Sequence, residues 1–216
     1  MADATTATTK TDLWSLIHEQ RQKVGDMLST LNDQQWDTAS LCAGWRVRDV
    51  AAHNIETHLM TPGRFISQYL GSGFRFDAMS QKGVDRHRTE PTSELLVQFR
   101  ETAKRSTSPP GPLMAMLGEV VIHGEDMARP VGKRIDTSPA TLIATLDYAH
   151  RTQPLLHGKA RSAGLKLRAT DVDWTAGEGP EVAGPASSII LAVTGRSAGL
   201  GDLTGDGVDT LRSRMP

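Results

Sequence analysis

Apolar residues recur every three or four positions through the N-terminal part of the chain, the spacing that places them on one face of an α-helix. This pattern predicts helices over residues 12–31, 46–61, 93–105, 113–129 and 138–156. Ser138, followed by a proline, is a suitable N-cap for the last of them. Pro62 and Gly63 interrupt the second helix, and a short apolar pattern resumes over residues 65–70. Residues 71–88 are polar and contain glycines, which predicts a long connection.

The pattern changes character after Gly158, where apolar and polar residues alternate over residues 165–170. A period of two is typical of a half-buried β-strand, and residues 172–176 are its predicted partner. A short apolar helix is predicted over residues 186–194, and a last helical piece ends at Met215.

These elements predict a mainly α protein in two parts. An antiparallel helical bundle covers residues 1–158, and a small α+β domain covers residues 159–216. Residues 1–10 are rich in Ala and Thr and are expected to form a disordered tail. The tail lacks the apolar core of a secretory signal, and no apolar run approaches the ~20 residues of a membrane helix. We therefore expect a cytoplasmic protein with no membrane partner.

The charge and the cysteine content limit the partners and reactions that the chain can have. The chain has 24 Lys and Arg against 25 Asp and Glu, a formal net charge of −1, so no overall field attracts nucleic acid. The single cysteine, Cys42, cannot form an intrachain disulfide. It lies in a turn of small residues, and we interpret it as a half-buried small apolar residue rather than a reactive thiol. If a thiol takes part in the chemistry, we expect a small molecule to supply it.

One predicted helix carries a pair of metal-binding residue types. Glu119 and His123 are four positions apart, so both side chains leave the same helix face one turn apart. The residues between them are apolar, and burying an unpartnered carboxylate there would cost several kcal/mol. A divalent metal ion removes that cost, because carboxylate oxygen and neutral imidazole are good ligands for zinc. A solvated Glu–His pair is the alternative for this spacing.

His53, on the second predicted helix, completes a set of three. The alternative for a lone histidine here is a core residue that is hydrogen-bonded to a backbone carbonyl. Facing helices that each supply inward ligands are, however, how helical bundles build metal sites. Three protein ligands are the number expected of a catalytic zinc site, which keeps coordination positions open. Three nitrogen and oxygen ligands do not distinguish zinc from nickel, iron or manganese.

Two acidic residues are candidates for orienting these ligands from behind. Asp126 follows His123 by three positions and could hold its imidazole, or could instead be solvated or pair with Arg129. Asp49 precedes His53 by four positions and could support it. Asp49 also suits the first turn of a helix, where the helix dipole favours a negative charge.

The same residues carry a family resemblance. Residues 41–53 (LCAGWRVRDVAAH) and 119–132 (EVVIHGEDMARPVG) resemble two signatures of the mycothiol-dependent maleylpyruvate isomerase family, within the DinB-like superfamily. The C-terminal part is similar to the C-terminal domain of that family. This similarity rests on residues 165–173, 182–186, 194–196 and 205–207. The resemblance implies a DinB-like bundle with metal ligands at His53, Glu119 and His123, mycothiol as cofactor, and an actinobacterial source.

The resulting hypothesis is a metal-dependent, mycothiol-using transferase or isomerase that acts on a small electrophile. In this mechanism the metal deprotonates the mycothiol thiol, and the thiolate attacks the electrophile. Arg196, after the short C-terminal helix, is a candidate contact for an anionic substrate or the sugar portion of the thiol. The alternatives are a non-catalytic metal- or ligand-binding module and a metal-dependent hydrolase with bound water as nucleophile. Either a monomer or a homodimer is compatible with the sequence.

Overall fold

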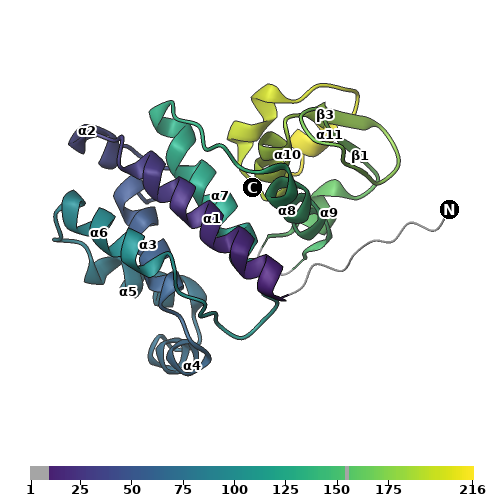
Figure 1. Ribbon diagram of the computed structural model, residues 1–216. Helices are drawn as coiled ribbons and strands as arrows, with labels where there is room; N and C mark the ends of the chain where they lie inside the picture. The colour runs from purple at the N-terminus through teal and green to yellow at the C-terminus, as the bar shows by residue number, and fades with distance from the viewer. Residues whose placement is uncertain (1–9, 154–155) are drawn as a thin grey trace.

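The structure of the protein is a computed structural model that describes residues 10–153 and 156–216 (Figure 1). Helices make up most of it, and a small sheet lies in the C-terminal part, which confirms the predicted mainly α fold class. Residues 1–9 of the predicted tail lie outside the described residues, whereas Lys10 is the first residue of α1.

The elements have the following bounds. The α-helices are α1 (Lys10–Leu28), α2 (Asp33–Trp36), α3 (Val47–His58), α4 (Pro62–Gly71), α5 (Phe76–Arg86), α6 (Thr92–Thr102), α7 (Met114–Ala128), α8 (Pro139–Arg151), α9 (Gly158–Ser162), α10 (Ala186–Val193) and α11 (Val208–Arg212). Two short 3-10 helices are η1 (Arg129–Val131) and η2 (Ser197–Asp202). The strands are β1 (Lys166–Ala169), β2 (Thr175–Ala176) and β3 (Glu181–Gly184).

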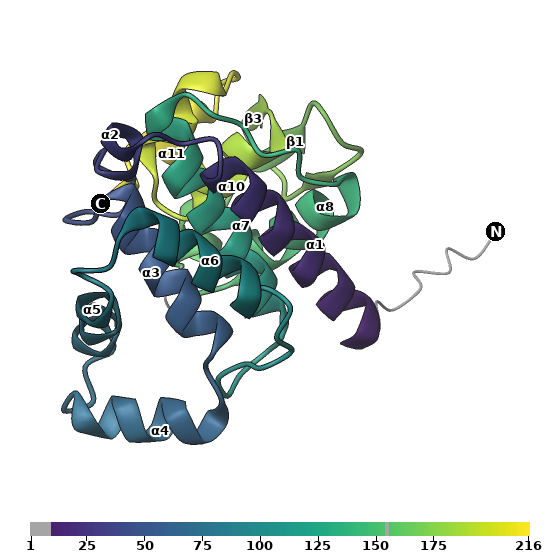
Figure 2. The same cartoon turned by 60° about the vertical axis from the view of Figure 1, so that its left-hand side comes forward.

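Four helices, α1, α3, α6 and α7, pack against one another around a first hydrophobic core (Figures 1 and 2). The apolar stripe of α1 supplies Ile17, Val24 and Leu28, all fully buried. Gly124 allows α7 to lie close to α1, because a Cβ there would be 3.0 Å from Val24 Cγ2 and 2.9 Å from Ile135 Cδ1. The periodicity of the sequence therefore predicted the helices that form this core, with ends shifted by a few residues.

The segment between the second and third predicted helices differs from the prediction. Pro62 does not interrupt a helix but occupies the first turn of a new one, α4, whose N-cap is Thr61. The predicted connection at residues 71–88 contains a further helix, α5. This helix was missed because it buries only Met79, Gly83 and Val84, too few apolar positions to show a period. Helices α4 and α5 lie outside the core: in Figure 2, α4 lies below α3, and α5 lies to the left of α3.

The C-terminal sheet has the strand order β2-β1-β3. Strand β1 pairs with its predicted partner, β2, in an antiparallel orientation and with β3 in parallel. Strand β3 was not predicted, because its buried residues are nearly continuous along the chain and do not alternate with exposed ones. Buried strands of parallel pairs have this property, since neighbours cover both faces.

A second hydrophobic core joins the C-terminal elements to the bundle. Helix α10 packs against α8, and the shared core includes Val121 and Ile122 of α7 together with Leu146 of α8. The opposite faces of α7 thus belong to different cores. The predicted domain boundary near residue 158 stays a prediction, but α8 packs with the elements that follow this boundary.

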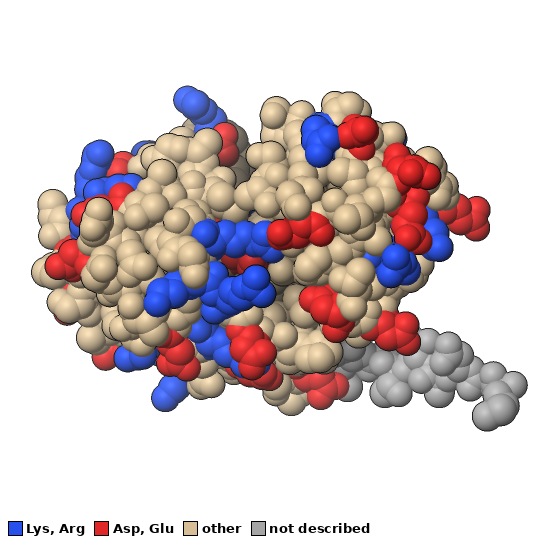
Figure 3. Space-filling view, turned by 90° about the horizontal axis from the view of Figure 1, so that it is seen from above, with Lys and Arg blue, Asp and Glu red and all other residues tan. Residues whose placement is uncertain are grey.

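The surface carries mixed charge, as expected for a chain with a net charge of −1. Seen from above, Lys and Arg side chains gather near the middle of the face, with Asp and Glu on either side (Figure 3). Among the described residues, no helix combines the length and apolar character needed to cross a membrane.

Candidate metal centre

Helices α3 and α7 pack against each other and bring the three predicted ligands together. His53, Glu119 and His123 each offer one ligand atom, and these atoms lie within 4.8 Å of one another. His53 Nε2 is 3.6 Å from Glu119 Oε1. The two imidazole rings meet edge to face, with centroids 5.1 Å apart. Their side chains are only 14% (His53) and 17% (His123) exposed, so the group is largely shielded from water.

A bound ion would give the buried Oε1 atom of Glu119 a partner. Its Oε1 atom is buried and has no hydrogen-bond partner among the described residues. Burial raises the pKa of this carboxyl group, although His123, a hydrogen bond from Thr57, and Arg21 act in the opposite direction. A buried carboxylate oxygen without a partner is costly, and a divalent cation between Glu119 and the two histidines would remove that cost. The donor set fits zinc or a neighbouring divalent metal.

Asp126 contacts His123, and its role in orienting the imidazole stays a prediction. Asp126 is fully buried, and its Oδ2 lies 2.9 Å from His123 Nδ1. With Nδ1 engaged, Nε2 of His123 is the nitrogen left for an ion. Burial lowers the pKa of His123, but hydrogen bonds to Asp126 and Cys42 outweigh it and raise the value to about 10. Asp126 itself has a lowered pKa: burial raises it, and the bonds to His123 and Arg196 more than reverse that effect.

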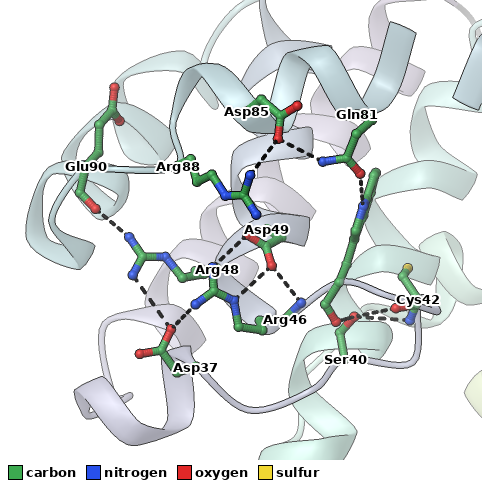
Figure 4. Close-up of polar contacts among 11 residues, drawn as sticks. Asp37, Ser40, Cys42, Arg46, Arg48, Asp49, Gln81, Asp85, Arg88 and Glu90 are labelled. Atoms are coloured by element: carbon green, nitrogen blue, oxygen red, sulfur yellow. Dashed lines mark hydrogen bonds and ion pairs between the residues drawn. The ribbon is translucent and has the colours of Figure 1, made fainter. Parts of the chain in front are cut away.

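His53 is in the opposite electrostatic situation. Burial, and secondly the neighbouring His123, lower its pKa to about 3. The imidazole is therefore neutral at physiological pH, which is the form that binds metals. The Trp45 ring covers His53 with centroids 5.1 Å apart, and Trp45 Nε1 donates a hydrogen bond to Gln81 Oε1 at 2.9 Å. In Figure 4, Gln81 of α5 reaches toward this indole.

Asp49 does not support His53. Its Oδ2 accepts hydrogen bonds from the backbone nitrogen and Nε of Arg46 at 2.9 and 3.1 Å. These bonds cap the N-terminus of α3, and Arg46 also reaches Asp37 in the same network (Figure 4). The suggestion that Asp49 orients a ligand is thus wrong, and the alternative role at the first helical turn is the observed one.

Cys42 is a site residue that the sequence analysis underrated. The thiol is half-buried, as expected, but its Sγ lies 3.1 Å from Asp126 Oδ2 and 3.6 Å from His123 Nδ1. A backbone hydrogen bond from Leu41 N to Asp126 O, 3.1 Å long, holds this turn against α7. Cys42, His123 and Asp126 form a second group whose potential ligand atoms lie within 4.8 Å. The sequence did contain a signal for this role, because Cys42 lies within the family signature that ends at His53.

Arg196 reaches the same carboxylate from the C-terminal part. Its Nε and Nη2 donate to Asp126 Oδ1 and Oδ2 at 3.1 and 2.9 Å. Only 19% of its side chain is exposed. Burial lowers the pKa of Arg196, and the Asp126 carboxylate more than compensates, so the guanidinium stays charged. Arg196 therefore connects the C-terminal elements to the ligand His123 through Asp126, and a contact with a bound thiol stays a prediction.

A pocket of about 60 Å³ opens beside His53 and Glu119. Its walls come from α3, α4, α5 and the segment that precedes α7. The three predicted ligands thus lie where a small molecule can reach two of them.

The N-terminal part of the chain matches a known protein family. Residues 17–108 match the family model of the mycothiol maleylpyruvate isomerase N-terminal domain. Comparison with curated proteins gives no match.

The chain also has the fold of a solved structure. It is similar to the crystal structure of a mycothiol-dependent maleylpyruvate isomerase, with a TM-score of 0.62 and 17% sequence identity over 91% of this chain and 92% of the other. A histidine-to-alanine mutant of such an isomerase has the same identity and coverage, with a TM-score of 0.57. The similarity extends through the C-terminal part, which the family model does not cover.

Proposed function

We propose that this chain, a member of the mycothiol maleylpyruvate isomerase family through its residues 17–108, is a metal-dependent enzyme that uses mycothiol to isomerise, or to transfer sulfur to, a small electrophile. The observation that carries the proposal is the convergence of His53, Glu119 and His123 around a buried carboxylate oxygen without a partner. We propose zinc as the ion, since two imidazoles and one carboxylate are a set typical of catalytic zinc.

A bound divalent ion would supply open coordination positions at which a thiol loses its proton. The residues of the chain provide the setting. Asp126 keeps Nδ1 of His123 occupied, and the burial of His53 keeps its imidazole neutral. The indole of Trp45 covers His53 and limits access of water from that side.

The reaction class follows from the reagent. A thiolate that adds to a conjugated double bond forms a C–S bond and leaves a single bond free to rotate. Expulsion of the thiolate from the resulting carbanion re-forms the double bond and gives the isomer, whereas protonation of the carbanion keeps the C–S bond and gives the transfer product. Arg196 is our candidate for contact with the bound thiol, because it lies behind His123 and comes from the C-terminal part.

The test begins with metal content. We expect about one equivalent of zinc in the wild type by elemental analysis after reconstitution, and almost none in a His53→Ala/His123→Ala double variant. His157→Asn, which changes an exposed histidine with positive φ, serves as the control and should keep the metal.

Titration calorimetry of mycothiol into the zinc-loaded wild type then tests the thiol. Saturable binding is expected, and it should be lost in the double variant. A zinc-loaded protein that binds no mycothiol would contradict the thiol-dependent function. Hydrolysis of a substrate by that protein without any thiol would support the hydrolase instead.

A further inference from the structure

The pocket beside His53 and Glu119 has mostly apolar walls. Met60 and Met79 are buried in it, and Phe65, Phe76 and Pro109 complete its apolar lining. Among the described residues, no lysine or arginine lines this pocket. A ligand in the pocket would therefore meet mainly hydrophobic surface and, at one end, His53 and Glu119.

The charged residue in the wall away from these ligands is acidic. Glu56 lies one turn after His53 on α3, and its side chain is only 9% exposed. It accepts hydrogen bonds from Arg86, with Nε at 3.1 Å from Oε1, and from Arg64, with Nη2 at 3.4 Å from Oε2. His87 Nε2 lies 3.2 Å from Oε1.

These contacts have an electrostatic consequence. Burial by itself raises the pKa of Glu56, but the bonds from Arg86, His87 and Arg64 reverse this effect, so the group remains ionised. Glu56 thus holds the guanidinium groups of Arg64 and Arg86, and neither arginine lines the pocket. These ion pairs also connect α4 and α5 to α3 and so hold the walls of the pocket in place.

We infer that this pocket binds the electrophilic substrate, and that the substrate is an uncharged, mainly apolar molecule such as an unsaturated ester, ketone or aromatic compound. This inference rests on the proposed function and specifies its substrate class. An anionic group in the pocket would exchange water for methionine and phenylalanine side chains and would find no lysine or arginine in the lining, which is unfavourable. The sugar portion of mycothiol is equally unsuited to these walls and has to lie outside them.

The experiment compares two ligands of one shape with the full chain freed of metal by a chelator. Methyl cinnamate carries a conjugated double bond and no charge, and cinnamate is the corresponding carboxylate. We expect the ester to bind at least about tenfold more tightly than the carboxylate in titration calorimetry or ligand-observed NMR. Equal or tighter binding of the carboxylate, or no binding of the ester, would overturn the inference.

Phe65 and Ile66 are neighbours on α4 and allow a variant of the pocket to be compared with a control variant. Phe65 lines the pocket, whereas Ile66 is 54% exposed and does not line it, and α4 buries no residue, so neither change should unfold the protein. Phe65→Ala should weaken ester binding about fivefold, and Ile66→Ala should leave it unchanged. Ser80→Trp, which fills the pocket from α5, should abolish it. Ester binding that survives Ser80→Trp would place the ligand elsewhere.

The experiments distinguish a failure of this inference from a failure of the proposed function. Zinc and mycothiol binding without ester binding would leave the function standing and reject the apolar substrate. Ester binding that responds to Phe65→Ala and Ser80→Trp, in a protein that binds no mycothiol, would keep the pocket and reject the thiol chemistry.

Discussion

Replacing Asp126 with asparagine is expected to destabilise the metal-free protein by about 2–4 kcal/mol. The carboxylate is fully buried and serves three partners from three parts of the chain. Arg196 donates two hydrogen bonds to it, His123 Nδ1 lies 2.9 Å away, and Cys42 Sγ lies 3.1 Å away. Asparagine preserves the shape of the side chain but has one acceptor oxygen and no charge.

The expected loss of stability follows from the interactions of the Asp126 carboxylate that an amide cannot make. At least one charge-assisted hydrogen bond is lost, which costs ~1.5–3 kcal/mol. The Arg196 guanidinium also loses its counter-charge, and removing one partner of a buried ion pair costs ~3–5 kcal/mol. Because 19% of the Arg196 side chain is exposed, water compensates in part and the lower portion of that range applies.

Urea unfolding followed by circular dichroism measures this difference. Asp209→Asn is the matched control, because the Asp209 side chain is 90% exposed and pairs with Arg212 at the surface. The control should change stability by less than ~0.5 kcal/mol. An Asp126→Asn protein that unfolds at the wild-type urea concentration would refute the role given to the carboxylate. The variant should also bind zinc ~10–100-fold more weakly, because His123 is no longer oriented.

Three further predictions concern the same region. In the metal-free protein His53 titrates near a pKa of about 3, against about 6.5 when unfolded, so its neutral form contributes stability that is lost as the pH falls from ~6.5 toward 3. The melting temperature of His53→Ala should therefore depend less on pH in that range, and an unchanged slope would contradict the assignment. Gly124→Ala should lower stability by ~1–3 kcal/mol in urea unfolding, because the new Cβ would lie 3.0 Å from Val24 Cγ2. Cys42→Ala should retain one equivalent of zinc by elemental analysis while Glu119→Gln loses it; the reverse pattern would favour the group that contains the thiol.

Local patterns in the sequence predicted some of the elements that carry the site. Helix α7 was predicted almost to its ends, since its apolar residues repeat with helical period and Pro130 follows it. Ser138 accepts the backbone hydrogen bond of Thr141 and caps α8, as its position before a proline suggested. Such features are local, because they depend on residues within one or two turns.

Helix α5 and strand β3 could not be found in the same way. The solvent-exposed side of α5 is polar, and the few residues it buries contact α3 and the pocket. Strand β3 is buried by α10 and by its parallel neighbour β1, so it lacks the alternation that marks an exposed sheet face. Both are stabilised by partners distant in the sequence, which no local pattern records.

The sequence by itself determined that Glu119 and His123 share one face of a helix, because helical geometry relates residues four positions apart. It also predicted His53 as the third ligand, through a resemblance and the chemistry of the residue types. Only the tertiary structure decided that Cys42 and Arg196 meet Asp126 behind His123. Those contacts join residues up to 84 positions apart. Their formation depends on how α3, α7 and the C-terminal elements pack, and packing is a property of the whole chain rather than of any segment.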